Sequence, residues 1–299
     1  MPTDFHGVYS AMATPFGADG AIDEAELRAS VDRAVEAGVD GLAPCGSTGE
    51  FTAMSDEERR RVVEIVVEEA AGRIPVVVQT GALTTKDAVA LSRHAAETGA
   101  AGVFAIVPFY EPLELDDVRG FYEALAEAVE VPVGIYNLPG GSGVDLDPDW
   151  VGALAREDER IAFIKDSTGN FAQISRLVVD HGDAITVFNG DDTLLLPALT
   201  AGAPASLLGT LNLLPAECAA VYDAYVEGRY GEAEALYRRI LPVSQFLVAG
   251  HYYSAGVKAG LDLLGHSAGE PRLPVLPLGG ERREKLRGLL EAVGAPTPA

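Results

Sequence analysis

The stretch Ile161-Ala162-Phe163-Ile164-Lys165 is a short apolar run that ends on a charged side chain, and it indicates the fold because it is one of eight. The other runs are Val8–Thr14, Gly41–Cys45, Pro75–Thr80, Gly102–Val107, Pro132–Tyr136, Ile185–Asn189 and Ala205–Leu208. Runs that are apolar at nearly every position are typical of parallel strands buried on both faces. Successive runs start 20 to 34 residues apart, which is the length of a strand, a crossover helix and the return.

The segments between the runs carry helix signals. Ser55-Asp56-Glu57-Glu58 matches a capping box, in which the serine accepts from a first-turn amide and the glutamate reaches back to the serine amide. Asp147-Pro148 begins another helix, with Asp as the N-cap and Pro in the first turn. Gly38, Gly72 and Gly99 stand where helices should end, since glycine tolerates the left-handed backbone that such ends need.

Eight strand–helix units predict an α/β protein with the (β/α)8 TIM barrel fold. The barrel would occupy residues 1–212, and residues 213–299 would form a C-terminal helical extension packed on it. Helical patterns in this tail cover Glu217–Gly228, Tyr230–Leu247, Val257–Leu264 and Glu281–Val293. A doubly wound sheet is the alternative fold, and it is less favoured because no G-x-G-x-x-G sequence opens a unit.

The composition excludes several classes of protein. Of the 299 residues, 48% are hydrophobic and 22% are charged, so a large packed core is expected. The 22 Lys and Arg against 45 Asp and Glu leave a net charge of −23, which argues against nucleic acid and anionic membranes as partners. No apolar run approaches the roughly 18 residues that span a bilayer, and the N-terminus does not read as a signal peptide. We therefore expect a soluble, cytoplasmic protein.

The choice of charged residues suggests a hypothesis about habitat. Only four of the 22 cationic residues are lysine. An acidic, lysine-poor surface is expected in a halophile, whose cytoplasm holds molar salt, because the Debye length there falls to about 3 Å. An ordinary acidic enzyme is the alternative. Cys45, Cys218 and the five histidines show no ligand spacing, so we expect no disulfide, no metal and no cofactor.

Candidate catalytic residues stand at the ends of the predicted strands, where barrel active sites gather. Lys165 ends a buried run, and partial desolvation favours the neutral amine that attacks ketones to form Schiff bases. The alternative is a lysine paired with a carboxylate such as Asp166. Tyr136 ends the preceding run, where its phenol could shuttle protons beside Lys165. A tyrosine that simply packs in the core is the alternative.

Two glycine-rich stretches differ in what they can bind. Gly46-Ser47-Thr48-Gly49 offers hydroxyls and exposed amides that suit a carboxylate, although such residues are often only turn formers. Gly140-Gly141-Ser142-Gly143 is expected to open no helix and carries no lysine, so it fits neither a Walker nor a Rossmann phosphate site. Cys45 is better explained as a small buried residue at a strand end than as a reactive thiol.

Together these residues resemble the dihydrodipicolinate synthase / N-acetylneuraminate lyase family of class I, Schiff-base aldolases. The resemblance covers nearly the whole chain, and its strength comes from the order and spacing of the motifs. These are Gly7-Val8, Thr14-Pro15-Phe16, Gly46-Ser47-Thr48-Gly49-Glu50, Pro108-Phe109-Tyr110, Tyr136-Asn137-Leu138-Pro139, Ile164-Lys165-Asp166, Asn189-Gly190-Asp191-Asp192 and Val257-Lys258-Ala259.

The resemblance implies catalytic roles for four residues. Lys165 would form the Schiff base with pyruvate or another 2-keto acid, and Tyr136 would be the proton shuttle. Thr48 would link Tyr136 to Tyr110. In the family this last tyrosine reaches the active site of a neighbouring subunit, so the resemblance also implies a homotetramer built as a dimer of dimers.

The resemblance also implies substrate contacts. The Ser47–Thr48 turn would hold the carboxylate of the keto acid, and Gly190 and Leu207 match positions that line the pyruvate pocket. Asp191, Asp192, Thr193, Ser206 and the Gly140–Gly143 loop are candidates for contacting substrate hydroxyls.

Three departures from the family's residues narrow the range of candidate substrates. The synthases carry an arginine, which contacts aspartate semialdehyde or its product, where this chain has Gly141. The sialic acid lyases carry an Asp-Glu pair where this chain has Asp192-Thr193. Archaeal aldolases that accept phosphorylated sugar acids carry an arginine where Leu113 stands. The first departure argues against lysine biosynthesis, and the last weakens the case for a phosphate pocket.

These departures favour a 2-keto-3-deoxy sugar acid, such as 2-keto-3-deoxygluconate or its 6-phosphate. Aldol cleavage would give pyruvate and an aldehyde, as in the Entner–Doudoroff route. The alternatives are a 4-hydroxy-tetrahydrodipicolinate synthase, a Schiff-base dehydratase of the same acids and an N-acetylneuraminate lyase-like enzyme. A non-catalytic keto-acid-binding protein is disfavoured because both Lys165 and Tyr136 are present.

Overall fold

The computed structural model describes residues 3–250, 253–295 and 297 of the chain. Within these residues, eight β-strands alternate with helices, and further helices follow the last strand. The predicted (β/α)8 TIM barrel fold is confirmed. None of the described helices has the length and the apolar composition that crossing a membrane requires.

The chain divides into two compact units. Residues 1–7 and 75–207 form unit 1, and residues 8–74 and 208–299 form unit 2. The boundaries fall at the first residue of the first strand and the last residue of the eighth. The predicted division into a barrel over residues 1–212 and an extension over residues 213–299 stays a prediction.

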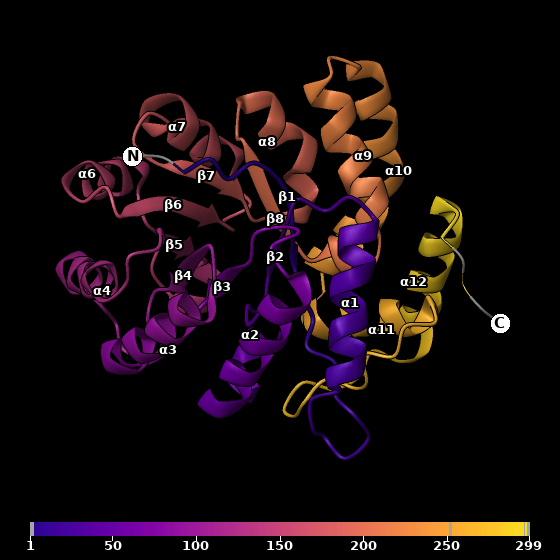
Figure 1. Cartoon of the computed structure of the whole chain (residues 1–299). Coiled ribbons are helices and arrows are strands. Elements are labelled where there is room, and N and C mark those ends of the chain that lie inside the picture. Colours follow the sequence, from indigo (N-terminus) through magenta and orange to yellow (C-terminus); the bar gives the residue numbers. More distant parts are fainter. Residues whose placement is uncertain (1–2, 251–252, 296, 298–299) are drawn as a thin grey trace. The chain divides into compact units, whose positions relative to one another are not determined.

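Unit 1 contains a parallel sheet whose strands are ordered β8-β7-β6-β5-β4-β3. Helices α3, α4, α6 and α7 lie on the outer side of these strands (Figure 1). The elements in chain order are β3 (Val77–Gln79), α3 (Thr85–Thr98), β4 (Gly102–Ile106), α4 (Leu115–Ala128), β5 (Val133–Asn137), α5 (Pro139–Ser142), α6 (Pro148–Glu157), β6 (Ile161–Asp166), α7 (Phe171–His181), β7 (Thr186–Asn189), α8 (Leu195–Ala201) and β8 (Ala205–Leu208).

Aromatic side chains fill the core between the strands of unit 1. Every residue of β4, β5 and β6 is buried, as the apolar runs predict. The ring centroid of Phe163 lies 6.3 Å from that of Phe104 and 5.5 Å from that of Phe188. Alternate residues of a strand share one face. Lys165 therefore leaves β6 on the same face as Phe163, at the carboxyl end of this aromatic cluster.

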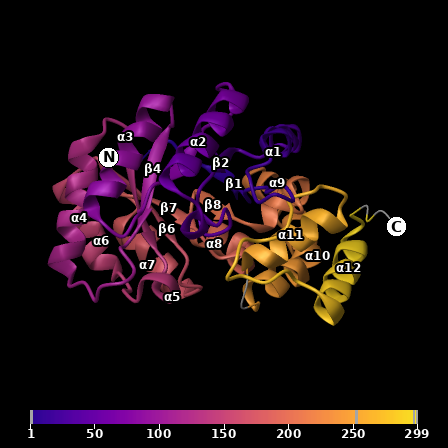
Figure 2. The same cartoon turned by 90° about the horizontal axis from the view of Figure 1, so that it is seen from below.

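Unit 2 contains the first two strands and the C-terminal helices. Strands β1 and β2 pair in parallel, and Tyr9 stands beside Gly41. Helix α12 packs against α10 and α11 (Figure 2). The elements are β1 (Gly7–Ala11), α1 (Glu24–Glu36), β2 (Gly41–Ala43), α2 (Asp56–Ala70), α9 (Pro215–Val226), α10 (Tyr230–Val248), α11 (Tyr253–Leu263) and α12 (Gly280–Val293).

The predicted helix starts are confirmed. Ser55 caps α2 in a capping box with Glu58, and both of its reciprocal hydrogen bonds are present. The side chain of Asp147 accepts from the backbone amide of Asp149, and Pro148 follows in the first turn of α6. Such caps stabilise helices by about 1 kcal/mol each, because they satisfy amides that have no partner inside the helix.

Strand ends differ slightly from the predicted runs. β2 ends at Ala43, two residues before the predicted end, because Pro44 has no amide hydrogen and Cys45 adopts a left-handed backbone with φ of +60°. β5 and β6 continue one residue further than predicted. The reason is that Asn137 and Asp166 still pair in the parallel register.

The expectation that Gly140–Gly143 opens no helix is wrong, because Pro139–Ser142 forms the one-turn helix α5. Pro139 fixes the first backbone angle, and the turn ends at Gly143, whose φ is +77°. The turn carries no charged side chain, so the segment still matches neither phosphate-binding pattern.

Candidate functional site

Strands β5 and β6 bring the two principal candidates side by side in unit 1. The parallel register pairs Tyr136 with Lys165, as the order of the two runs predicts. Both side chains are buried, with 3% of Tyr136 and 6% of Lys165 exposed. The Nζ atom of Lys165 lies 4.2 Å from the centroid of the Tyr136 ring. The amine and the aromatic face therefore lie together in the buried interior of unit 1.

The ring of Tyr136 is held by neighbouring packing. Phe104 on β4 meets it edge-on, with ring centroids 5.7 Å apart. Such aromatic pairs contribute about 0.5–1.5 kcal/mol beyond the area that they bury. A ring held in this way leaves its phenol oxygen little positional freedom, which suits repeated proton transfer at one place.

Asp166 does not form the ion pair with Lys165 that was considered from the sequence. Successive residues of a strand point to opposite faces, so its carboxylate leaves β6 on the other side. There it accepts hydrogen bonds from the Thr168 hydroxyl at 2.5 Å, the Asn137 amide nitrogen at 3.1 Å and the Gln173 amide nitrogen at 3.3 Å. Burial nevertheless raises the pKa of Asp166 above its ordinary value, and the hydrogen bonds from Thr168 and Asn137 oppose that shift. The network ties the ends of β5 and β6 together.

Gly190 provides room for the lysine side chain. A Cβ atom at this position would lie 2.9 Å from Cε of Lys165 and 2.1 Å from the hydroxyl oxygen of Ser167. Any larger residue would displace the amine or the serine. The backbone nitrogen of Gly190 donates to the Asp166 carbonyl at 2.7 Å. The end of β7 is therefore fixed against the end of β6 at the point where Lys165 emerges.

The remaining candidates of unit 1 lie on or after other strands. Asp191 is occupied locally, because its carboxylate accepts from the backbone and the hydroxyl of Thr193 at 2.8 and 2.5 Å. Asp192 is buried, and Leu207 on β8 is buried. Tyr110 follows β4 and is 83% exposed. Their substrate-binding and catalytic roles stay predictions.

The Ser47–Thr48 turn lies in unit 2, after β2. Ser47 is exposed and Thr48 is buried. The backbone nitrogen of Glu50 donates to the Ser47 carbonyl at 3.1 Å, which closes the turn. Its two flanking residues, Cys45 and Glu50, both have left-handed backbones, with φ of +60° and +59°. Such angles are strained for residues with a side chain, so surrounding contacts must hold the turn.

Cys45 is a buried structural residue, as the sequence suggests. Burial raises the pKa of its thiol to about 11. The thiol is therefore protonated at neutral pH and is a poor nucleophile. Among the described residues, no group of three or more His, Cys, Asp or Glu side chains could hold a metal ion.

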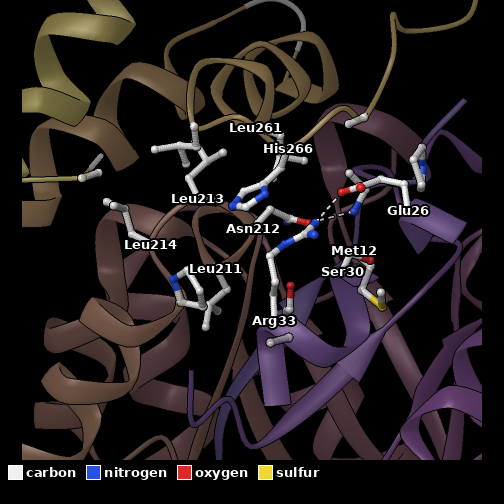
Figure 3. A pocket seen from close by; sticks show the side chains of 18 of the residues that line it. Met12, Glu26, Ser30, Arg33, Leu211, Asn212, Leu213, Leu214, Leu261 and His266 are labelled. Atoms are coloured by element: carbon white, nitrogen blue, oxygen red, sulfur yellow. Dashed lines mark hydrogen bonds and ion pairs between the residues drawn. The ribbon is translucent and has the colours of Figure 1, made fainter. Parts of the chain in front are cut away.

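A separate pocket of about 210 Å³ lies in unit 2 (Figure 3). Helix α1 contributes Arg33 and Glu26, which form an ion pair at 2.6 Å. His266 lies beside them, and burial lowers the pKa of its ring. The apolar part of its lining includes Leu211, Leu213, Leu214 and Leu261. None of the predicted site residues lines this pocket.

The sequence did not single out the residues that support the lysine. Asn137 ends β5 and Asn189 ends β7, the strands on either side of β6. The amide nitrogen of Asn137 donates to Asp145 at 3.1 Å, and that of Asn189 donates to the Asp191 carbonyl at 2.9 Å. The sequence feature that could have identified these two asparagines is their position, because each amide side chain stands at the end of a predicted strand. The Thr168 and Gln173 contacts to Asp166 carried no such signal.

Comparisons with known proteins agree on one family. Residues 4–293 match the family model described as the dihydrodipicolinate synthetase family. The 4-hydroxy-tetrahydrodipicolinate synthase of Pelobacter propionicus is 38% identical over 290 residues, covering 97% of this chain and 99% of the relative. That of Methanothrix thermoacetophila is 38% identical over 293 residues, covering 96% of each chain.

Solved structures give the same result. Dihydrodipicolinate synthase from Aquifex aeolicus matches with a TM-score of 0.94 and 32% identity, covering 99% of this chain and 100% of that one. A prophage protein of the dihydrodipicolinic acid synthase family from E. coli K12, solved in complex with pyruvate, matches with a TM-score of 0.94. It is 28% identical, and the match covers 98% of this chain and 100% of that one.

Proposed function

Because the chain belongs to the dihydrodipicolinate synthetase family of pyruvate-dependent lyases, we propose that Lys165 forms a Schiff base with the keto carbon of pyruvate. The observation that carries this proposal is the register of β5 and β6, which pairs Lys165 with Tyr136 in a buried wall. The neutral form of a lysine amine is the one that attacks a ketone.

The steps balance with these two residues and water. Nζ of Lys165 attacks the keto carbon, and the carbonyl oxygen takes a proton to give a carbinolamine. Loss of that oxygen as water leaves an iminium, which draws electrons from the adjacent methyl carbon. Removal of a methyl proton gives an enamine, which attacks an aldehyde to form the new C–C bond and an iminium of the product. Water hydrolyses this iminium, which releases the product and frees Lys165. The phenol of Tyr136 would move the protons, a role that contributes roughly 10²–10⁴-fold to such reactions.

The names of the relatives support aspartate semialdehyde as the aldehyde, in a 4-hydroxy-tetrahydrodipicolinate synthase reaction. Relatives named for this activity are 38% identical over nearly the full length of both chains. This support favours the synthase over the cleavage of a 2-keto-3-deoxy sugar acid, which the sequence departures alone would place first.

Cleavage of a 2-keto-3-deoxy sugar acid stays the second candidate, and Gly141 is the observation that favours it. The synthases carry an arginine at this position, whereas α5 here is Pro-Gly-Gly-Ser and has no charged side chain. A carboxylate on the second substrate would lose a charge-assisted hydrogen bond at this place. A neutral, hydroxylated tail would not.

One assay separates the two candidates. The purified protein is given pyruvate with aspartate semialdehyde, and in a second reaction 2-keto-3-deoxygluconate alone. The synthase proposal expects a higher kcat/KM for pyruvate consumption in the first reaction than for pyruvate release in the second. A higher kcat/KM for pyruvate release from the sugar acid would contradict it. The Gly141→Arg variant sharpens the comparison, because it should raise kcat/KM for aspartate semialdehyde. Gly140→Arg is the matched control, which should not.

The remaining roles are part of the same proposal. The Ser47–Thr48 turn would bind the carboxylate of pyruvate, and Thr48 would pass protons between Tyr136 and Tyr110. Ser47→Ala should raise KM for pyruvate, and Thr48→Val should lower kcat.

The proposed homotetramer is tested by sedimentation of the purified protein, since a monomer at micromolar concentration would contradict it.

A further inference from the structure

Three motifs of the chain have no part in the proposed chemistry, yet they meet in unit 2. They are Thr14-Pro15-Phe16, Glu50 at the end of the glycine-rich turn, and Val257-Lys258-Ala259 on α11. The hydroxyl of Thr14 donates to the Gly49 carbonyl at 2.8 Å. Nζ of Lys258 lies 2.7 Å from Oε1 of Glu50. The side chains of this ion pair are 1% and 4% exposed, so it is screened very little by water.

The second oxygen of Glu50 has a different partner. Oε2 accepts from the backbone nitrogen of Arg272 at 2.8 Å. The guanidinium of Arg272 forms a fork with Glu58, at 2.9 and 2.5 Å, and it donates to the Ala53 carbonyl at 2.8 Å. Glu50 is thus fixed by two segments of the C-terminal region at once, α11 and the loop after it.

The ring of Phe16 completes the cluster. Nζ of Lys258 lies 3.9 Å from its centroid, and the guanidinium carbon of Arg272 lies 4.1 Å from it. Each of these contacts is a cation–π interaction, which gains strength where water is excluded. Nζ of Lys258 also donates to the Glu270 carbonyl at 3.2 Å. This amine is therefore engaged by a carboxylate and a carbonyl, which separates Lys258 from a nucleophile.

The cluster contacts the glycine-rich turn directly, because Glu50 belongs to the cluster and is also the last residue of the turn. The left-handed backbones of Cys45 and Glu50 need external contacts to persist. Gly49 packs closely on the first strand's end, since a Cβ atom there would lie 3.0 Å from the Met12 carbonyl oxygen. Thr48, two residues before Glu50, is therefore placed by the buried carboxylate that ends its turn.

We propose that Glu50, Lys258 and Arg272 position the Ser47–Thr48 turn for the carboxylate of pyruvate, so that the C-terminal region sets the affinity for the keto acid. This inference rests on the proposed function. The three side chains are positioning residues, because each acts on substrate only through the backbone of the turn.

The test compares Lys258→Met, the double variant Lys258→Met with Glu50→Gln, and the control Leu290→Ala. Leu290 is fully buried on α12, so its truncation destabilises the same unit without contacting the turn. The positioning role expects KM for pyruvate to rise about tenfold or more in both Lys258 variants, the equivalent of ~1.4 kcal/mol of lost binding. kcat at saturating pyruvate should change far less.

The double variant distinguishes positioning from simple stabilisation. Removing both charges leaves no unpaired buried ion, so its melting temperature should recover part of the loss seen in Lys258→Met. Its KM should stay high, because nothing then holds the turn. A double variant that recovers both melting temperature and KM would overturn the proposal. So would a Leu290→Ala variant with the same rise in KM.

Hydrogen exchange gives a readout that does not depend on catalysis. Amides of residues 45–54 should exchange faster in both Lys258 variants and at the unaltered rate in Leu290→Ala. Unchanged exchange in the Lys258 variants would contradict the positioning role. Failure of the unaltered protein to form a borohydride-trapped pyruvate adduct would instead overturn the proposed function, and the exchange rates would still decide whether these side chains hold the turn.

Discussion

The two buried lysines, Lys165 in unit 1 and Lys258 in unit 2, differ in one contact on which our proposal depends. Each has its Nζ over an aromatic ring, at 4.2 Å from Tyr136 and at 3.9 Å from Phe16. Lys258 has in addition a carboxylate partner, Glu50, at 2.7 Å. Among the residues that the structure describes, Lys165 has no such ion pair.

This difference teaches that burial alone does not make a lysine reactive. Burial lowers the pKa of Lys258, but the ion pair of its amine with Glu50 opposes that shift. A Schiff base needs a free electron pair on the amine. The lysine without a carboxylate is therefore the nucleophile of our proposal, and the paired lysine is a structural support.

The largest expected effect is the loss of turnover in Lys165→Met. Methionine keeps the approximate volume but cannot form an iminium, so kcat should fall about 10⁴-fold or more. The melting temperature should stay level or rise, because the variant removes a buried amine that has no counter-charge. Turnover within tenfold of the unaltered enzyme, measured as pyruvate consumption, would show that another group is the nucleophile.

Tyr136→Phe is expected to have the next largest effect. It keeps the ring beneath the lysine but removes the phenol, so kcat should fall by roughly 10²–10⁴. Borohydride trapping should become slower without vanishing, since the amine is intact. Stopped-flow rates of adduct formation check this, and near-normal turnover would reduce Tyr136 to a core residue.

Lys258→Met should lower the stability of the protein, whereas Lys165→Met should not. It leaves Glu50 buried without its counter-charge, which typically costs about 3–5 kcal/mol in the free energy of unfolding. Urea denaturation of this variant beside Lys165→Met measures the contrast directly. Equal stability of the two variants would mean that the Glu50 ion pair contributes nothing that distinguishes the two lysines.

The sequence predicted the fold and the pairing of Lys165 with Tyr136 more completely than it predicted the contacts that surround the two buried lysines. Eight apolar runs of regular spacing predict a barrel because parallel buried strands require them, and adjacent strand ends predict the meeting of Lys165 and Tyr136. The cluster around Lys258 was not predictable in the same way. Glu50, Phe16 and Lys258 come from segments far apart in the chain, and no local pattern reports that two charges share a buried space.

The α5 turn shows the same limit at short range. Glycine-rich sequence has low helix propensity, so Gly140–Gly143 reads as a loop. Pro139 and the cap at Gly143 nevertheless close one helical turn. Context outweighed propensity there, as it did for the strained backbone of Cys45 and Glu50.

The smallest expected effect is the dependence of the melting temperature on salt concentration. The net charge of −23 should repel itself at low ionic strength, so the melting temperature should rise toward molar salt, where the Debye length is about 3 Å. The buried Glu50–Lys258 pair is not screened in this way. The difference in melting temperature between the unaltered protein and Lys258→Met should therefore stay constant across the salt series. A melting temperature that ignores salt would make the acidic composition incidental.

The most direct test of the central claim is the site of borohydride trapping. The protein is incubated with pyruvate and borohydride, digested and mapped by mass spectrometry, with Lys165→Met treated in parallel. We predict one three-carbon adduct on Lys165, none on Lys258, and no adduct in the variant. An adduct on Lys258, or the absence of any adduct in the unaltered protein, would contradict the claim that the unpaired lysine is the nucleophile.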